Sequence, residues 1–554
     1  MSLKETKRLK ADVLIIGGGG ASLRAAIEAR EMGADVLVVS KARIGYANNT
    51  YISAGIFAAT GWGDPDDDYR VHLKDAVIGG RFVNDQKLLA VAVREAGAQV
   101  TLLERCGVKF FKQEGKLRLG RAPGHSHSRH VNVFRQGGSG FMLPLKAQAE
   151  KVGVRFKDQA FITRLVKQDQ QIAGALGFDS DGSFLVFRAK CIILTTGGYS
   201  RIYQRTNNAA GITGDGLALA FDLGLPLRDM EFVQFYPTSL GSSGNRNILY
   251  EGIVALGNAV LRNAEGENII TKHQIDDPRI MTRDRVSRAI MEEIREGRGV
   301  DGGVILDLST VADLPRWARV FPKTWSAEET EMKVSPTTHF CMGGVITDEQ
   351  TETAVSGLFA AGEVTGGVHG ANRLGGNALA EVFALGGVAG RQAALRARQI
   401  DMPDIHDDPI SVERARLAAL LSSDGSEDAH DQQEIRRLLK DVMWRKAGVL
   451  RTDEELGEAL DEIERLNTDS RRLSVSNARQ LMKLQELLNM LLISEMVCLA
   501  ARRRTESRGA HFRSDFPKED NTNWLKNTVI QKTDGAIGLT DLPVSMDHVK
   551  MPET

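Results

Sequence analysis

The feature that most constrains the fold is an apolar run near the N-terminus that is followed at once by four consecutive glycines. Ala11–Ile16 is apolar, Gly17–Gly20 follow, and Ala21–Arg30 has the pattern of a helix that Gly33 ends. Asp35–Val39 is a second apolar run. A strand, a glycine loop, a helix and a second strand in this order are typical of a β–α–β unit. We therefore expect an α/β protein with a parallel sheet.

The glycine loop has the spacing of a dinucleotide-binding motif. Gly17-x-Gly19-x-x-Ser22 matches Gly-x-Gly-x-x-Gly, with a serine that is small enough for close packing at the third position. Glycines let backbone N–H groups approach a pyrophosphate, which rests on the positive N-terminus of the helix. NAD sites usually have an acidic residue about 20 residues further on, but this chain has Ser40 and Lys41. The motif predicts a dinucleotide site without that acid; a glycine-rich turn in an unrelated α/β domain is the alternative.

Length and charge narrow the class of protein. The chain has 554 residues, of which 42% are hydrophobic and 26% are charged. These values are typical of an ordinary globular protein with three or four domains. The formal net charge of -1 argues against a nucleic-acid-binding protein, because such proteins usually carry a basic excess.

The cysteines and the apolar segments bear on cofactors and location. Cys106, Cys191, Cys341 and Cys498 are far apart, so no iron–sulfur, zinc or haem-attachment spacing is present. Isolated cysteines are typical of a reducing compartment, and the first ten residues lack the apolar core of a signal peptide. Leu484–Ala501 contains two glutamates and an asparagine, which favours a core helix over a membrane span. We expect a cytoplasmic protein without direct membrane insertion.

Two further apolar runs, Arg188–Thr195 and Gly357–Ala361, lead into glycines as the first strand does. Strand-then-glycine units so far apart suggest one sheet that is interrupted by an insertion. Arg155–Val166 and Gly174–Asp179 are predicted to be hairpin strands that lead into the first of these runs.

The rest of the chain divides into an insertion and a helical region. Gln234–Phe340 has mixed α/β character with one clear helix, Arg283–Arg295. Beyond about residue 408 the composition shifts to Leu, Arg, Glu and Lys, and helical periodicity appears. The periodic stretches are Gln432–Lys446, Thr452–Leu466 and Asn477–Arg504. Residues 516–554 have no strong period.

Seven stretches of the chain resemble, in the same order, the motifs of one family. They are Ile15–Ala26, Thr195–Tyr203, Thr213–Ala218, Arg283–Gly299, Pro336–Gly344, Ala361–Leu379 and Glu506–Arg513. These stretches are similar to the flavoprotein subunits of the succinate dehydrogenase/fumarate reductase family, which includes L-aspartate oxidase. The resemblance covers nearly the whole chain, which is identified as a divergent member.

The resemblance implies a Rossmann-like FAD-binding domain that is interrupted by an α+β capping domain and followed by a C-terminal helical domain. Combined with the patterns above, it gives a discontinuous FAD-binding domain over residues 1–233 and 342–405. The capping domain is then expected over residues 234–341, the helical domain over 406–515 and a tail segment over 516–554.

The resemblance also implies which residues contact FAD. They are Gly17, Gly19, Gly20, Ala21, Ser22, Ser40, Lys41, Asn48, Asn49, Thr50, Gly55, Gly197, Asp215, Glu363, Ala378 and Leu379. Two of these have simpler alternatives: Asp215 as an ordinary turn residue and Glu363 as a carboxylate at a helix start. Family members that bind FAD covalently use a histidine, and aligning the chain on Gly55 places Asn48 at that position. An amide cannot replace the nucleophilic imidazole, so we expect non-covalent FAD.

The catalytic set is also implied by the resemblance. The family passes a hydride between the flavin and one carbon of a C=C/CH–CH bond while a proton moves to or from the other carbon of that bond. His339 and Arg373 match the residues that bind a substrate carboxylate, a role that suits the planar fork of arginine. Arg283 matches the proton donor, and Glu251 matches the carboxylate that relays protons to it. The alternatives are a helix-end arginine paired with Asp284 for Arg283, a structural salt bridge for Arg373 and a core histidine for His339.

Three positions depart from the family pattern. Tyr236 stands where the family has a histidine, Tyr250 where it usually has a threonine, and Val254 where it has a relay arginine. A phenol can donate a hydrogen bond but carries no positive charge. A second substrate carboxylate would therefore need another cation, for which Arg246 is a candidate. We expect a substrate other than plain fumarate or succinate, such as a substituted succinate.

Two polar clusters have open roles. His125, His127 and His130 allow three interpretations: a metal site, a loop beside flavin and substrate, or a plain polar loop. No carboxylate or thiol follows at ligand spacing, so no metal is predicted. Glu506–His511 matches a C-terminal family signature that lies near the flavin domain and the iron–sulfur partner in multi-subunit members; a structural link is the alternative.

The leading hypothesis is a flavoprotein subunit that acts on a dicarboxylate-like acid, passes electrons to or from an iron–sulfur partner, and reaches the cytoplasmic face of a membrane only through a partner. An L-aspartate oxidase-like enzyme is the first alternative, favoured by Asn48 but weakened by Tyr236 and Val254. A flavin electron-transfer subunit with altered catalysis is the second, favoured by the altered relay.

Overall fold

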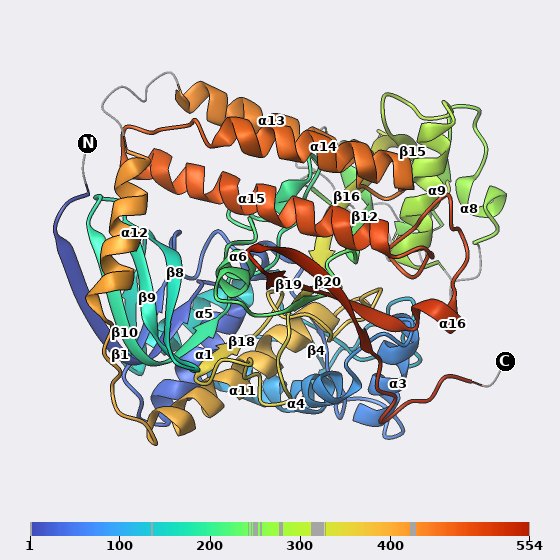
Figure 1. Ribbon diagram of the computed structural model, residues 1–554. Helices are drawn as coiled ribbons and strands as arrows, with labels where there is room; N and C mark the ends of the chain where they lie inside the picture. The colour runs from blue at the N-terminus through green and yellow to red at the C-terminus, as the bar shows by residue number, and fades with distance from the viewer. Residues whose placement is uncertain are drawn as a thin grey trace.

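The computed structural model describes residues 3–134, 137–241, 243–244, 246–247, 253–254, 258–275, 281–311, 326, 328–421 and 428–552. Figure 1 shows the arrangement of its helices and strands, with the N-terminus beside the largest sheet and the C-terminus at the opposite side of the view.

The largest sheet has seven strands in the order β7-β2-β1-β10-β9-β8, with β18 also paired to β10. They are β1 (Thr6–Ile16), β2 (Val36–Val39), β7 (Arg155–Lys157), β8 (Ala160–Gln168), β9 (Gln171–Asp179), β10 (Phe184–Leu194) and β18 (Leu358–Ala360). Pairing is parallel from β7 to β10 and between β10 and β18, whereas β9 and β8 are antiparallel. The predicted α/β class and the sheet rebuilt from distant segments are confirmed.

Apolar residues alternate between the two faces of this sheet. Val13 and Ile15 of β1 lie in a buried cluster with residues of α1, α4, α5 and α11. Leu14 and Ile16 lie in a second cluster that extends to the C-terminal helices. A strand directs successive side chains to opposite faces, so β1 joins both cores. The helices of this region are α1 (Gly20–Glu31), α2 (Asn49–Ile52), α3 (Tyr69–Gly79), α4 (Gln86–Arg105), α5 (Ser139–Lys151), η1 (Ser200–Ile202), α6 (Asp215–Asp222) and α11 (Asn377–Ala397).

One strand prediction is corrected. Arg155–Val166 does not form a single strand, because β7 pairs with β2 at one edge of the sheet, whereas β8 lies at the opposite edge. The chain breaks at Asp158–Gln159, where Gln159 has φ +54°. The β8–β9 hairpin itself agrees with the prediction. Two small pairs, β3 (Ile56–Ala58) with β6 (His130–Asn132) and β4 (Lys112–Gln113) with β5 (Lys116–Leu117), flank this region.

The inserted segment forms a second sheet in the order β13-β12-β16-β15-β14. Its elements are β12 (Val233–Leu240), β13 (Arg246–Asn247), β14 (Val260–Arg262), α8 (Ile269–Lys272), α9 (Arg283–Arg295), β15 (Val304–Asp307) and β16 (Glu331–Cys341). The predicted helix Arg283–Arg295 is α9. An apolar cluster that includes Tyr236, Val254 and Val286 joins α9 to the sheet. Mixed α/β character of the insertion is confirmed.

The C-terminal half contributes long helices and a third sheet. The helices are α12 (Asp407–Ala419), α13 (Asp428–Lys446), α14 (Asp453–Ser470), α15 (Ala478–Arg503) and α16 (Asn521–Trp524). In Figure 1, α13, α14 and α15 lie side by side. Among the described residues one helix, α15, is long and apolar enough to cross a membrane, but 72% of its apolar window is buried inside the protein, as in the core helix predicted there.

The final segment, for which the sequence predicts no element, forms a β-hairpin. Its strands are β19 (Lys526–Thr533) and β20 (Ala536–Pro543). They extend a four-stranded sheet in the order β17-β11-β19-β20, whose other members are β11 (Leu227–Arg228) and β17 (Gly344–Val345). Through β19, which pairs with β11, this hairpin is joined to the sheet that also contains β17.

Candidate active site

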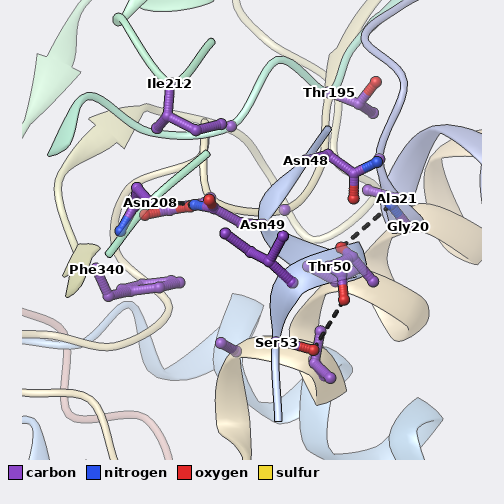
Figure 2. A pocket seen from close by; sticks show the side chains of 18 of the residues that line it. Gly20, Ala21, Asn48, Asn49, Thr50, Ser53, Thr195, Asn208, Ile212 and Phe340 are labelled. Carbon is purple, nitrogen blue, oxygen red and sulfur yellow. Dashed lines mark hydrogen bonds between the residues drawn. The ribbon is translucent and has the colours of Figure 1, made fainter. Parts of the chain in front are cut away.

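One large cavity of about 1150 Å³ runs between the glycine loop of the main sheet and the second sheet. Figure 2 shows part of its wall. Of the residues expected to contact a dinucleotide, those that line it are Gly17, Gly19, Gly20, Ala21, Ser40, Lys41, Asn48, Asn49, Thr50, Gly55, Gly197, Asp215, Glu363, Ala378 and Leu379. Tyr236, Arg283, His339 and Arg373 line the same cavity. The space has the size of a large ligand site.

The glycine loop forms a cradle that a side chain would block. A Cβ atom on Gly17 would lie 2.3 Å from the carbonyl oxygen of Thr195, and Gly17 has φ +138°. A Cβ atom on Gly20 would lie 2.9 Å from Thr50 and Val382. Gly19 is the N-cap of α1 and has no side chain to cap the first turn. The positive end of α1 therefore faces the cavity with its backbone, as a pyrophosphate site requires.

Ser22 alone among the expected cofactor residues is absent from the cavity wall. It is fully buried, and its hydroxyl lies 2.7 Å from that of Thr195. Ser22 therefore joins α1 to the end of β10, which agrees with the close helix–strand packing predicted for the third motif position and not with a direct contact.

A buried ionic cluster forms one end of the cavity. The ammonium group of Lys41 donates to Asp215 at 2.6 Å, to Glu486 at 2.7 Å and to Thr213 at 2.7 Å. Burial alone would lower the pKa of Lys41, but the two carboxylates outweigh it, so the pKa is raised. Asn489 also donates to Asp215. Glu486 and Asn489 lie on α15, so the C-terminal half helps to shape this end.

Two asparagines stand near the middle of the cavity. Asn48 caps α2 by accepting from Tyr51 N and donates to Gly18 O. Asn49 donates to Glu363 at 3.0 Å. Glu363 also accepts from the backbone of Cys341, yet burial raises its pKa to about 7. An amide stands at both positions, and neither can serve as an imidazole nucleophile.

The other half of the cavity is built around Gln234 on β12. Its side-chain oxygen accepts from Arg283 at 3.2 Å and from Arg373 at 3.0 Å. Its amide nitrogen donates to Asn372 at 2.9 Å and to the carbonyl of Arg373 at 2.8 Å. Gln234 thus holds two guanidinium groups, from α9 and from the loop before α11, in one place.

Aromatic rings support the same two arginines. The Arg283 guanidinium lies 5.0 Å from the Tyr236 ring centre, and that of Arg373 lies 4.6 Å from the Phe340 ring. The ring of His339 lies 5.3 Å from that of Tyr236, and its Nδ1 meets the Asn207 side chain. Burial, and then the charges of Arg283 and Arg373, hold the pKa of His339 well below its usual value. The imidazole is therefore neutral, and the arginines carry the positive charge of this half.

Several expected residues lie elsewhere or outside the described part. Tyr250 and Glu251 lie outside the described residues, as does the side chain of Arg246. Val254, at the position where the resemblance predicts a relay arginine, is buried in the apolar cluster of the second sheet.

The histidine-rich segment lies against the cavity. Nε2 of His125 and Nε2 of His130 both lie within 2.9 Å of the carbonyl oxygen of Gly375. His130 lines the cavity, whereas His127 bonds to Ser126 beside it. In the described part of the chain no group of His, Cys, Asp and Glu is arranged to hold a metal ion. Burial lowers the pKa of His125 well below its usual value, so His125 supports the loop before α11 as a neutral hydrogen-bonding group.

Comparison with known proteins agrees with this geometry. An FAD-binding-domain family model matches residues 12–379, and a model of the fumarate reductase flavoprotein C-terminus matches residues 436–554. The succinate dehydrogenase flavoprotein subunit of Rickettsia bellii is 32% identical, over 94% of this chain and 92% of that protein. The chain belongs to the succinate dehydrogenase/fumarate reductase flavoprotein family. It is an FAD-dependent oxidoreductase of the class that acts on CH–CH bonds.

Other members are similar over the same length. One subunit of the fumarate reductase (CoM/CoB) of Methanothermobacter marburgensis is 36% identical, over 95% of this chain and 98% of that protein. A solved structure of E. coli quinol fumarate reductase FrdA, a mutant form, superposes with a TM-score of 0.90 at 29% identity and 99% coverage of both chains. The cavity volume, the glycine cradle and the α1 N-terminus fit the FAD that this family binds.

Sequence reasoning missed Gln234, although a signal was present. In a strand, residues two apart face the same side, so Gln234 and Tyr236 belong to one face of β12. Glu486 carried no such signal, because it is 445 residues away from Lys41.

Proposed function

We propose that this chain is the flavoprotein subunit of an oxidoreductase that interconverts a dicarboxylate-like acid and its α,β-unsaturated form, with a substituted succinate as the substrate class. The observation that carries this proposal is the convergence of Arg283, Arg373 and His339 on the cavity that the glycine loop also lines. When bound, FAD supplies the group that accepts or donates a hydride. The protein must then bind the acid, orient it and move a proton.

Each residue has a role that its position supports. Arg373 and His339 hold one carboxylate, the arginine through charge and the neutral imidazole through a hydrogen bond. Arg283 donates a proton to, or accepts one from, the carbon of the reacting bond that does not exchange the hydride. Free arginine has a pKa above about 12, so this role requires a nearby carboxylate, which we assign to Glu251. Tyr236 and Tyr250 contribute phenol groups where a charged partner would bind a second carboxylate.

A described cation is available for that second carboxylate. Arg121 is exposed, lines the cavity and is anchored by its Nε, which donates to His125 O at 2.8 Å. In the described part of the chain it makes no ion pair with a carboxylate. A Cβ on Gly375 would lie 3.2 Å from the Ala122 side chain and 3.8 Å from Arg283, so the residue after Arg121 lies near Arg283. We propose Arg121 for the role in which the sequence suggests Arg246.

The test is a substrate screen on the FAD-loaded protein with reduced methyl viologen as electron donor. Fumarate, mesaconate (methylfumarate) and bulkier 2-substituted fumarates are compared. We expect a substituted acid to have the highest kcat/KM, and Arg121→Gln to raise KM for it by about tenfold, as expected for loss of one charged hydrogen bond. Ordinary efficiency with fumarate as the best substrate would contradict the substrate class. Peroxide formation with L-aspartate would instead support the L-aspartate oxidase-like alternative.

We further propose that FAD is held non-covalently, with asparagine at positions 48 and 49. Acid precipitation of the protein should leave the flavin in the supernatant. A yellow pellet would show a covalent bond and contradict the proposal.

The electron route is proposed to run through a separate iron–sulfur subunit, since the relatives are named as subunits and this chain has no cluster-binding cysteine spacing. Such a partner would also account for association with a cytoplasmic membrane face. Affinity purification from the native cells should recover a cysteine-rich partner in fixed ratio to the flavin. Recovery of the flavoprotein alone, with full activity toward a soluble electron carrier, would argue against the partner.

A further inference from the structure

We propose that the buried C-terminal turn Arg508–His511 is a positioning element for the substrate-binding Arg373. The proposal rests on the function proposed above. It gives a role to the C-terminal signature that the FAD site and the substrate residues leave unexplained.

The turn contacts the loop of Arg373 through its backbone. Ala510 N donates to Ala371 O at 2.9 Å, and Ala371 N donates to Gly80 O at 2.9 Å. Gly509 has φ +53°, and a Cβ atom there would lie 2.5 Å from Ala371 O. Ala371 is two residues before Arg373. Any side chain at position 509 would therefore displace the segment that leads to the substrate arginine.

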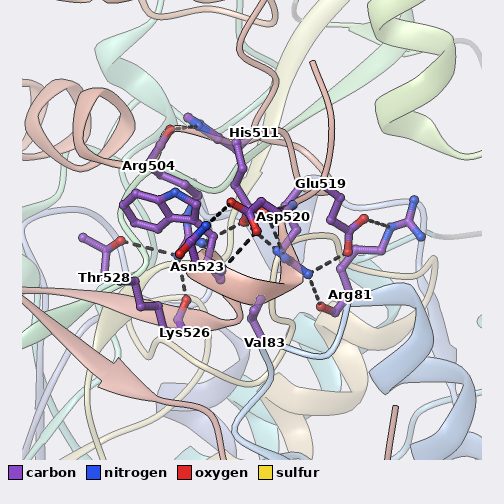
Figure 3. Close-up of polar contacts among 12 residues, drawn as sticks. Arg81, Val83, Arg504, His511, Glu519, Asp520, Asn523, Lys526 and Thr528 are labelled. Atoms are coloured by element: carbon purple, nitrogen blue, oxygen red, sulfur yellow. Dashed lines mark hydrogen bonds and ion pairs between the residues drawn. The ribbon is translucent and has the colours of Figure 1, made fainter. Parts of the chain in front are cut away.

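The turn is held by ion pairs among fully buried side chains. Arg508 binds Glu506 in bidentate fashion, at 2.7 and 2.9 Å, and Arg504 binds the same carboxylate at 2.9 Å. Arg508 also binds Glu519 at 2.6 Å and donates to Arg81 O. Figure 3 shows this cluster from close by, with Arg81, Arg504, His511 and Glu519 labelled. The side chains of Arg504, Glu506 and Arg508 are 0% exposed, so the ion pairs are shielded from solvent.

The same cluster reaches the strand that carries Gln234. Arg504 binds the Glu231 side chain at 2.7 Å. Arg451 donates to Glu231 O and to His511, both at 2.8 Å. Glu231 is three residues before Gln234, which binds Arg373 directly. The turn is thus connected to Arg373 from two directions.

A small apolar cluster fills the space between these contacts. It comprises Val83, Phe232, Phe340, Met342, Ala371 and Ala510. The ring of Phe340 supports the Arg373 guanidinium. Displacement of Ala510 would therefore also disturb the ring on which that guanidinium rests.

The experiment compares Gly509→Ala with Gly535→Ala in the FAD-loaded full chain. Gly535 is the matched control, because it also has positive φ (+84°) but has open space around a Cβ atom, in the β19–β20 turn. Two quantities are measured: hydrogen exchange of the peptide over residues 367–376, and the Kd of mesaconate from its effect on the flavin spectrum. FAD content and hydrogen exchange over residues 20–31, which form α1 after the glycine loop, monitor the cofactor half of the cavity.

We expect Gly509→Ala to speed exchange at residues 367–376 and to weaken mesaconate binding by at least tenfold, with FAD content and exchange at residues 20–31 unchanged. Gly535→Ala should change neither quantity. Unaltered hydrogen exchange and an unaltered Kd in Gly509→Ala would overturn the proposal. An equal increase in exchange at residues 367–376 and at residues 20–31, with loss of FAD, would also overturn it, because that pattern describes a general structural role.

If Gly509→Ala does not fold, Arg508→Lys decides the same question, because it retains the charge and removes the bidentate fork. If the wild-type protein binds no mesaconate, the proposed substrate class fails, whereas the exchange measurement still tests the positioning role.

Discussion

The cofactor half and the substrate half of the cavity differ in what places their functional groups. In the cofactor half, a short stretch around Gly17–Gly20 presents backbone at the end of a helix. In the substrate half, side chains from β12, α9, β16 and the loop before α11 converge, and Gln234 joins two of them. One half depends on backbone geometry, and the other depends on the identity of a few side chains.

This difference explains why the two halves have diverged unequally from the family pattern. Ser22 packs α1 against the end of β10 behind the cradle, so a serine there leaves the backbone of Gly17–Gly20 free to line the cavity. A single substitution in the other half changes charge: Tyr236 and Val254 are buried and uncharged at positions where the resemblance predicts cations. The substrate class proposed above therefore requires no change in the cofactor half of the cavity.

The sharpest test of the contrast removes Arg283. Arg283→Gln should lower turnover by about 10²- to 10⁴-fold, the usual contribution of a general acid, with FAD content unchanged. Steady-state kinetics and the flavin spectrum measure the two effects. Arg285→Gln, on the same helix but outside the cavity wall, should have little effect. Unchanged turnover in Arg283→Gln would favour the flavin electron-transfer subunit with altered catalysis.

A second test removes a buried lysine from the cofactor half of the cavity. Lys41→Met leaves Asp215 and Glu486 buried without their shared partner, which typically costs about 3–5 kcal/mol. We expect a loss of that size in the free energy of unfolding, measured with urea, together with weaker FAD binding. Lys483→Met is the control, because Lys483 binds Glu486 from a half-exposed position and should cost less than about 1 kcal/mol. Equal effects would contradict a special role for Lys41.

The third test uses pH on FAD-free protein. Burial raises the pKa of Glu363 from 4.5 to about 7, so the folded protein binds this proton more tightly than the unfolded chain does. Stability should therefore fall as pH rises from about 4.5 to 7, by up to about 3 kcal/mol. Glu363→Gln should remove this dependence and be the more stable protein at pH 8. If the free energy of unfolding depends on pH in the same way in both proteins, the raised pKa of Glu363 is contradicted.

The smallest expected effect restores a family residue. Tyr236→His should raise kcat/KM for fumarate relative to the substituted substrate by about tenfold, as expected when a charge-assisted hydrogen bond to a carboxylate replaces a neutral one. Tyr236→Phe, which loses only the hydroxyl, should not raise it. If both variants behave alike, the phenol is not what sets the substrate preference.

The sequence predicted the parts of the molecule that local patterns control. The β–α–β unit, the interrupted sheet, α9 and the long C-terminal helices follow from apolar periodicity and glycine position. The division of residues 155–168 between opposite sheet edges did not, because pairing partners are chosen by tertiary contacts and not by strand propensity. The β19–β20 hairpin was missed for the same reason: its partner β11 lies about 300 residues earlier.

The candidate site shows the same limit. The residues of single motifs, such as Arg283 and Arg373, were found, whereas partners contributed by remote segments were not. Glu486 beside Lys41 and Ala510 beside Ala371 become neighbours only in the folded chain. Neither composition nor motif spacing predicts such contacts.

The late position of the C-terminal turn has a consequence for biosynthesis. Chains emerge from the ribosome N-terminus first, and domains generally fold as units in that order. Every strand of the main sheet and the helix α11 are available once residue 397 has emerged. The contacts of Ala371, Glu231 and Arg228 with residues 504–528 form only after those residues have also emerged. A truncated product that stops before this turn would have the elements of a flavin-binding scaffold without an assembled substrate pocket.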